Sequence, residues 1–255
     1  DNNSCGFWFE INPLVGSNDK IEKNLTLFFN DELPEGSYLQ FLIVASHDIS
    51  QPLDIWERER TSGGPNLKNL TKYRKWFINN CALDFAASHD GRLARNYRTF
   101  VTYSSFGAND KKTIEQVIKF KQKLSNKLKA ERLSPRECNA SDLISIGREI
   151  LQMNLEMDNS KAPKVKYNVL NNLSDQICNP MTSASFGSDR INHDTTGLVT
   201  KIFYPKELPE SFSLAEMIKL LGSNDKMIPA RFILSYSLAS NLGSSGTPSL
   251  ASQGH

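Results

Sequence analysis

The hydrophobic and polar positions of the chain follow the period of strands in some stretches and the period of helices in others. Residues 38–45 are apolar except for Gln40, and turn-forming residues precede them at 34–36. A short apolar run that follows a turn signal is typical of a strand buried on both faces of a sheet. Residues 6–11 and 96–104 predict two further strands, so we expect a sheet to organise the first part of the chain.

Between these strands, apolar residues recur at the spacing of an amphipathic helix. They predict one helix over 18–31 and another over 110–130. In the second helix the residues expected to face inward are Ile114, Val117, Ile118, Leu124 and Leu128.

Residues 52–61 and 65–88 predict two helices that form a hairpin inserted between sheet strands. Trp56, Trp76 and Phe77 lie on its apolar stripe. Such a stripe is typical of a buried core, although the same aromatic residues could form an exposed surface for a partner.

A short strand is expected around 132–138, held to a sheet edge by Pro135. Asn139 then precedes a helix, with Asp142 three residues later in the pattern of a capping box. The order β-α-β, helical hairpin, β-α-β is that of the split βαβ, ferredoxin-like pattern with an insertion.

We therefore predict an α+β fold with a ferredoxin-like (split βαβ) sheet, an inserted helical hairpin and a second partial α/β unit. The predicted division is a first unit over 1–154 with its insertion at 52–88, a linker at 155–164, a second unit over 165–239 and a disordered tail over 240–255.

The second unit is expected to contain strands near 184–192 and 198–204, a helix at 213–221 and a strong strand at 231–238. This part holds too few apolar residues for a core of its own. We expect its last strand to find its partners beyond the end of the chain, as in a fragment of a longer protein.

Composition excludes several classes of protein. With 39% hydrophobic and 23% charged residues and a net charge of +2, the chain has the composition of a globular protein, and its overall charge does not require a nucleic-acid or membrane partner. The four cysteines follow no repeated spacing, so a disulfide framework or a zinc site is not expected. The amino-terminal residues lack the pattern of a signal peptide.

The sequence contains no nucleotide-binding loop of the G-x-x-x-x-G-K-[ST] type, and its histidines share no metal-ligand spacing. Ser46, His47 and Asp48 are the residue types of a hydrolase triad. Neighbours on a strand point to opposite faces, however, and cannot relay a proton among themselves. We therefore predict no catalytic, cofactor-binding or metal-ligating residues.

Four lysines lie along one side of the predicted helix 110–130, namely Lys112, Lys119, Lys123 and Lys127. They form the candidate partner-binding surface, a basic face that could meet anionic lipid, nucleic acid or an acidic protein. A row of lysines on a helix is also typical of a face that is simply solvated.

Several segments together resemble the amino-terminal domain of the TraC-type conjugative-transfer ATPases of type IV secretion systems. They occur in one collinear order over residues 5 to about 238: GFWFEINP from Gly6, LPEG from Leu33, QFLIVASHDI from Gln40, LDIW from Leu53, Arg98 to Ser104, DLISIGREIL from Asp142, YNVL from Tyr167, DQI from Asp175, Tyr204 to Leu221 and IPARFIL from Ile228.

The resemblance implies a cytoplasmic protein, peripheral to the inner membrane, that forms hexamers and powers pilus assembly and substrate transfer. It also implies that ATP is bound in a carboxy-terminal domain that these residues do not include, so no cofactor is expected here. Its expected partners are other type IV secretion components at the inner membrane and copies of itself, with no specific nucleic acid.

The expected function is thus non-catalytic assembly and docking. The alternative is a nucleic-acid-binding module that uses a ferredoxin-like sheet with Tyr97 and Tyr103 as stacking residues and the basic helix. A hydrolase at Ser46–Asp48 ranks third.

Overall fold

The computed structural model forms two compact units, which are described separately. The first comprises residues 1–45, 97–138 and 233–255, and the second comprises 46–96 and 139–232. Within them the structure describes residues 3–12, 19–60, 62–83, 94–107, 110–151, 166–178, 183–194, 197–204, 228 and 231–240.

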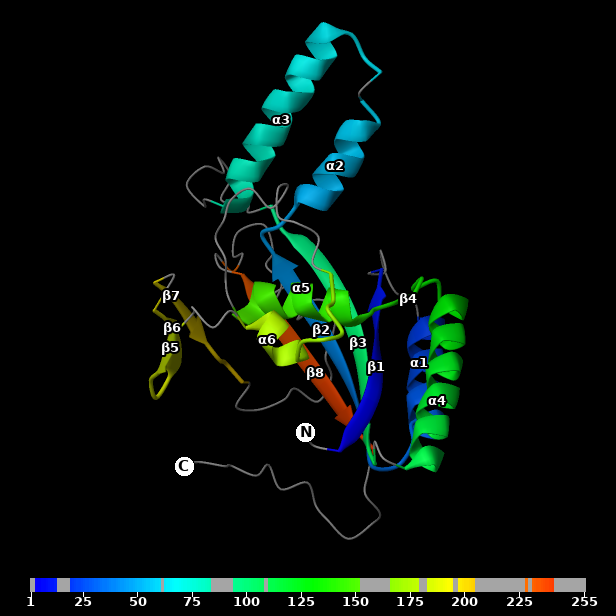
Figure 1. The fold of residues 1–255 in the computed structure, drawn as a ribbon. Coiled ribbons are helices and arrows are strands. Elements are labelled where there is room, and N and C mark those ends of the chain that lie inside the picture. The colour runs from blue at the N-terminus through cyan, green and yellow to red at the C-terminus, as the bar shows by residue number, and fades with distance from the viewer. Residues whose placement is uncertain are drawn as a thin grey trace. The chain divides into compact units, whose positions relative to one another are not determined.

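The first unit is built on a five-stranded sheet (Figure 1). Its strands lie in the order β4-β1-β3-β2-β8, with the bounds β1 Ser4–Ile11, β2 Ser37–Ser46, β3 Asn96–Phe106, β4 Arg136–Glu137 and β8 Phe232–Ala239. β1 pairs antiparallel with both β3 and β4. Because β3 lies between β1 and β2, the two strands joined by helix α1, this is the split βαβ arrangement. The predicted α+β, ferredoxin-like fold is confirmed.

Helices α1 (Asp19–Glu32) and α4 (Lys111–Ala130) cover one face of this sheet and enclose its core. α4 packs through Val117, Phe120, Leu124 and Leu128, which recur at spacings of three and four residues and are all buried. The strands contribute the apolar residues Phe9, Ile11, Leu39, Val101 and Tyr103. The burial of residues from α4 and three strands in one cluster, with Phe28 and Phe29 of α1 partly buried against it, is the main stabilising feature of the unit.

The inward face of α4 differs from the prediction at two positions. Ile114 and Ile118 are 40% and 50% exposed, although both were expected to face inward. Phe120 is buried in their place, because the line of contact with the sheet runs through Phe120 and the residues four and eight positions after it. At ~100° per residue, Ile114 and Ile118 lie to the side of that line.

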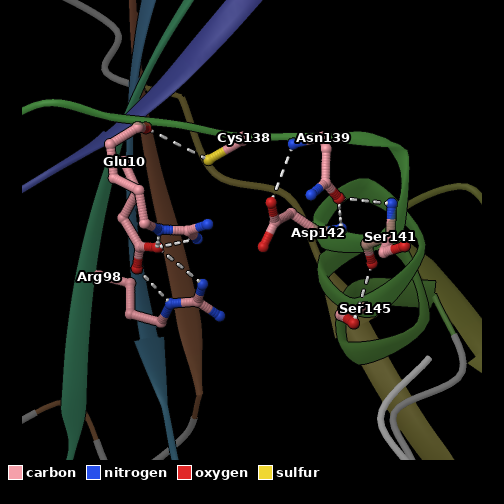
Figure 2. Close-up of polar contacts among 8 residues, drawn as sticks. Glu10, Arg98, Cys138, Asn139, Ser141, Asp142 and Ser145 are labelled. Carbon is pink, nitrogen blue, oxygen red and sulfur yellow. Dashed lines mark hydrogen bonds and ion pairs between the residues drawn. The ribbon is translucent and has the colours of Figure 1, made fainter. Parts of the chain in front are cut away.

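Glu10 of β1 joins three strands through its carboxylate. Arg98 of β3 donates from Nε to Glu10 Oε1 at 2.7 Å, as Figure 2 shows. Arg136 of β4 donates from Nη2 to the other oxygen, Oε2, at 2.5 Å. Partial burial raises the pKa of Glu10, but the hydrogen bonds and charges of the two guanidinium groups outweigh it, and the net pKa lies below its usual value.

Strand β8 pairs with β2, two hundred residues earlier in the chain. Ser240 donates its backbone N–H to the carbonyl oxygen of Ser37 at 3.1 Å, and Gln40 Nε2 donates to Ser235 Oγ at 2.9 Å. Higher numbers on one strand match lower numbers on the other, so the two strands are antiparallel. The expectation that this strand would need partners from beyond the chain is therefore wrong.

The second unit contains four helices and a small separate sheet among the described residues. The bounds are α2 Ser50–Arg58, α3 Pro65–Leu83, α5 Ala140–Leu151, α6 Leu173–Ile177, β5 Ala184–Phe186, β6 Arg190–His193 and β7 Leu198–Lys201. The three strands form an antiparallel sheet in the order β5-β6-β7. The predicted hairpin of helices is present as α2 and α3 (Figure 1).

The predicted strand at 184–192 is in fact a hairpin of two strands. Gly187 donates its N–H to the carbonyl oxygen of Arg190 at 2.8 Å, which turns the chain between β5 and β6. Between β6 and β7 the N–H of Gly197 donates to the carbonyl oxygen of His193 at 2.8 Å. Gly197 has a φ of 69°, a conformation that glycine adopts without steric cost.

A capping box begins α5, as the sequence predicted (Figure 2). Asn139 Oδ1 accepts hydrogen bonds from the backbone N–H groups of Ser141 and Asp142 at 2.9 and 3.1 Å. Asp142 Oδ2 accepts in return from the N–H of Asn139 at 2.8 Å. These contacts satisfy the backbone donors that a helix leaves unpaired at its start.

Three sequence predictions fall on residues outside the described ranges. They are the linker at 155–164, the helix at 213–221 and the tail beyond residue 240. The predicted boundaries between units at these positions stay predictions.

Candidate functional site

Helix α3 presents a row of apolar side chains that no described residue covers. Leu70 is 65% exposed, Tyr73 68%, Trp76 59% and Phe77 40%. These four residues form the α3 aromatic face. Large apolar side chains gathered on one surface mark interaction sites more often than the scattered ones found on every protein. The interpretation of this stripe as buried core is wrong for Trp76 and Phe77.

The opposite side of α3 packs on α2 and fixes the helix in its orientation. Ile49 and Leu53 form a small buried cluster with Ala82, against which Ile78 also packs. Thr71 is buried as well, and its hydroxyl donates to the carbonyl oxygen of Leu67 at 2.8 Å. The buried side of α3 is thus accounted for by α2, and the aromatic face is left outward.

An ion-pair cluster reinforces this contact between the two helices. Lys75 Nζ lies 2.8 Å from Asp54 Oδ1 and 2.7 Å from Glu57 Oε2, both on α2. The hydrogen bonds to Asp54 and Glu57 raise the pKa of Lys75. This lysine therefore serves the hairpin itself rather than the outer surface.

The remaining charges of α3 all have one sign. The helix contains no aspartate or glutamate, and its other cations are the exposed residues Lys68, Lys72 and Arg74. Among the described residues, no carboxylate lies within ion-pair distance of these three side chains. The aromatic face is therefore accompanied by cations whose charge is not neutralised by described neighbours.

Two of the four lysines of the predicted basic face of α4 are engaged within their own unit. Lys123 contacts Glu32 of α1 at 2.5 Å, and Lys127 contacts Glu131 at 3.2 Å. Lys112 and Lys119 are exposed, without an ion-pair partner among the described residues. The structure thus leaves two of the four lysines available to a partner, and a role in binding stays a prediction.

Ser46, His47 and Asp48 do not form a triad. Ser46 Oγ accepts a hydrogen bond from the backbone N–H of Asp48 at 2.9 Å. Asp48 Oδ1 accepts from the N–H and hydroxyl of Ser50 at 3.0 and 2.5 Å, where α2 begins. Ser46 and Asp48 therefore shape the turn from β2 into α2, as short polar side chains do at helix starts.

His47 is buried without hydrogen bonding. His47 is only 8% exposed, and neither of its ring nitrogens has a hydrogen-bond partner among the described residues. Burial, together with the positive charges of Arg231 and Arg95, lowers the pKa of His47 to about 4, against a smaller opposing effect of Asp48. The ring is consequently neutral at pH 7.

The sheet offers no stacking platform at Tyr103. This side chain is buried between Phe7 and Phe120, with ring centroids at 5.1 and 4.6 Å, and burial raises its pKa. A base could not reach it. The proposed use of Tyr103 as a nucleic-acid stacking residue is therefore wrong.

In the part of the chain that the structure describes, no group of three His, Cys, Asp or Glu side chains is close enough to hold a metal ion. None of the described helices combines the length and the apolar character required to cross a bilayer. The four cysteines, all of them described, form no disulfide with one another.

The sequence indicated only part of the α3 aromatic face. Periodicity identified the apolar stripe with Trp76 and Phe77 on it but not Tyr73, and it could not tell whether another element would cover them. A further signal in the sequence is that α3 contains no acidic residue beside its cations.

The chain is similar to one family of known proteins. A family model described as "TraC protein" matches residues 1–239. This range includes every segment on which the resemblance was based. No curated protein and no solved structure matches the chain.

Proposed function

The chain belongs to the TraC protein family, which takes part in conjugative transfer by type IV secretion, and from this membership we propose that residues 1–240 act as a non-catalytic docking domain. The domain attaches the protein to the inner-membrane side of the secretion machinery. Its parent protein assembles with further copies of itself there to drive pilus assembly and substrate transfer.

The observation that carries this proposal is the α3 aromatic face. Tyr73, Trp76 and Phe77 bury large areas when they meet a partner, and aromatic residues of this kind supply much of the binding energy at interfaces. The hairpin is an insertion in a ferredoxin-like sheet that does not need it for its core. A surface added to a complete fold in this way is well suited to attachment.

A docking role also agrees with the motifs of the sequence. The G-x-x-x-x-G-K-[ST] loop does not occur in the 255 residues, and Ser46–Asp48 forms a helix-starting turn. The proposal therefore assigns contacts to this domain and leaves ATP to another part of the parent protein.

The experiment replaces the gene of the full-length protein by a Trp76→Ser/Phe77→Ser variant in cells that perform conjugation. We expect transfer frequency and the fraction of the protein found with membranes to fall, while the amount of protein stays unchanged. Ile114→Ser/Ile118→Ser is the matched control, since it removes two apolar side chains of similar exposure from α4. Normal transfer and membrane association in the α3 variant would refute the proposal.

A further inference from the structure

The charge and geometry of α3 indicate what its aromatic face contacts. We propose that α3 lies in the plane of an anionic lipid surface, with its aromatic rings among the headgroups and its cations against lipid phosphates. This inference rests on the docking function and names the partner of that same surface.

The apolar side chains form a compact arc on the helix. Leu70, Tyr73 and Phe77 follow one another at spacings of three and four residues, which places them on the same side. Trp76 lies beside them, with its ring centroid 5.7 Å from that of Tyr73. Tyrosine and tryptophan have an apolar ring and a polar atom, and they favour the boundary between water and the lipid interior.

Cations border this arc on both sides. At ~100° per residue, Lys72 lies next to the Trp76 edge and Arg74 next to the Leu70 edge. Lys68 lies one turn before Lys72. Helices that bind in the plane of a membrane have this arrangement, in which long basic side chains reach the headgroups while aromatic and aliphatic residues enter the interface.

The charge around the arc has the sign that anionic lipid requires. The arc is bounded along the helix by Asn69 and Asn80, which are neutral, and α3 contains no acidic residue that an anionic surface would repel. α4 lacks this combination, because it contains Glu115 and because Lys123 and Lys127 are engaged by carboxylates.

A lipid surface also fits this face better than a protein partner does. Binding to lipid needs apolar area and positive charge but no matched set of donors and acceptors. Along α3 itself the charged residues are all cations and the other polar residues include several amides, without the mixed charges that fix the register of a protein interface.

The test is sedimentation of the full 255-residue chain with vesicles. One set contains phosphatidylcholine alone, and the other contains equal parts of phosphatidylcholine and phosphatidylglycerol. We expect binding to the anionic vesicles only, and weaker binding as salt is added. Comparable binding to both sets, or to neither, would overturn the proposal.

Variants then assign the binding to α3. Trp76→Ser/Phe77→Ser should lower partitioning at least about tenfold, and Lys68→Gln or Lys72→Gln about fivefold each. Ile114→Ser, Ile118→Ser and the variant that combines them are controls on α4 that should bind as the natural chain does. Equal losses in the α4 controls would show that the binding is not specific to α3 and would contradict the proposal.

Trp76→Phe provides a readout of depth. This variant keeps the apolar area and should bind nearly as well, but the quenching of tryptophan fluorescence by brominated lipid should fall, because Trp76 is the tryptophan placed in the interface. Unchanged quenching would place a different surface on the lipid and would refute the assignment.

The two proposals can fail separately. If the α3 variant abolishes transfer while the natural chain ignores anionic vesicles, the face docks on a protein and only the lipid inference is wrong. If the chain binds vesicles through α3 but transfer does not depend on Trp76 and Phe77, the docking function is wrong.

Discussion

The Nζ atom of Lys75 lies 2.8 Å from the Oδ1 atom of Asp54, so an ion pair joins α3 to α2. Glu57 adds a second carboxylate at 2.7 Å. Among the described residues, Lys75 is the cation of α3 that has carboxylate partners, and these partners hold it against α2. The contact therefore separates the charges that maintain the hairpin from those that face outward.

Replacing Lys75 by Gln should reduce the free energy of unfolding by no more than about 1 kcal/mol, because the pair is partly exposed to solvent. Its contribution is present at neutral pH and is lost as pH rises through the raised pKa of Lys75. Denaturant unfolding of Lys75→Gln and of the control Lys68→Gln measures this difference. If the two variants were equally stable, the ion pair would contribute nothing.

Glu10→Gln should destabilise the protein by about 1–3 kcal/mol, because Arg98 and Arg136 would lose the carboxylate between them. Since the pKa of Glu10 is lowered in the folded protein, its contribution is present at pH values above the usual 4.5 and disappears as pH falls through the lowered pKa. Denaturant titrations at neutral and acidic pH measure both effects. Glu32→Gln, at a more exposed ion pair, is the control and should change stability less; an equal change would argue against a special role of Glu10.

Gly6→Ala should destabilise β1 by at least about 2 kcal/mol. A Cβ atom at Gly6 would lie 2.0 Å from the backbone oxygen of Tyr103, so the paired strands β1 and β3 would have to move apart. Gly64→Ala is the matched control, because a Cβ atom there meets nothing within 4 Å. Thermal unfolding compares the two, and a Gly6→Ala protein as stable as the control would contradict the register of these strands.

His47 should make the protein less stable as pH falls from about 6.5 to about 4. Its pKa of about 4 in the folded state lies below the usual 6.5, so the unfolded chain binds the proton more tightly. Protonation therefore lowers the free energy of unfolding by up to about 3 kcal/mol by pH 4. His47→Leu removes this titration while filling a similar volume, and its stability should fall less over that range. If both proteins lost the same stability between pH 6.5 and pH 4, His47 would not titrate in this way.

Local sequence signals predicted the elements well but not what lies against them. Asn139 and Asp142 are three residues apart, so their capping box could be identified directly. Ile114 and Trp76 belong to apolar stripes that are wider than the part of each helix that is buried. Periodicity alone does not say which part of such a stripe is covered. The pairing of Ser37 with Ser240 leaves no local signal at all, because register between distant strands depends on the whole sheet.

The position of β8 has a consequence for synthesis in the cell. Ser37 and Ser240 are 203 positions apart, so at ordinary rates of translation β2 emerges roughly 10–40 s before its outer partner. During that interval the hydrogen-bonding groups on one side of β2 lack their final strand, and such an edge can pair with other chains. Among the described strands, β8 is the one that later covers this side of β2 and ends its exposure.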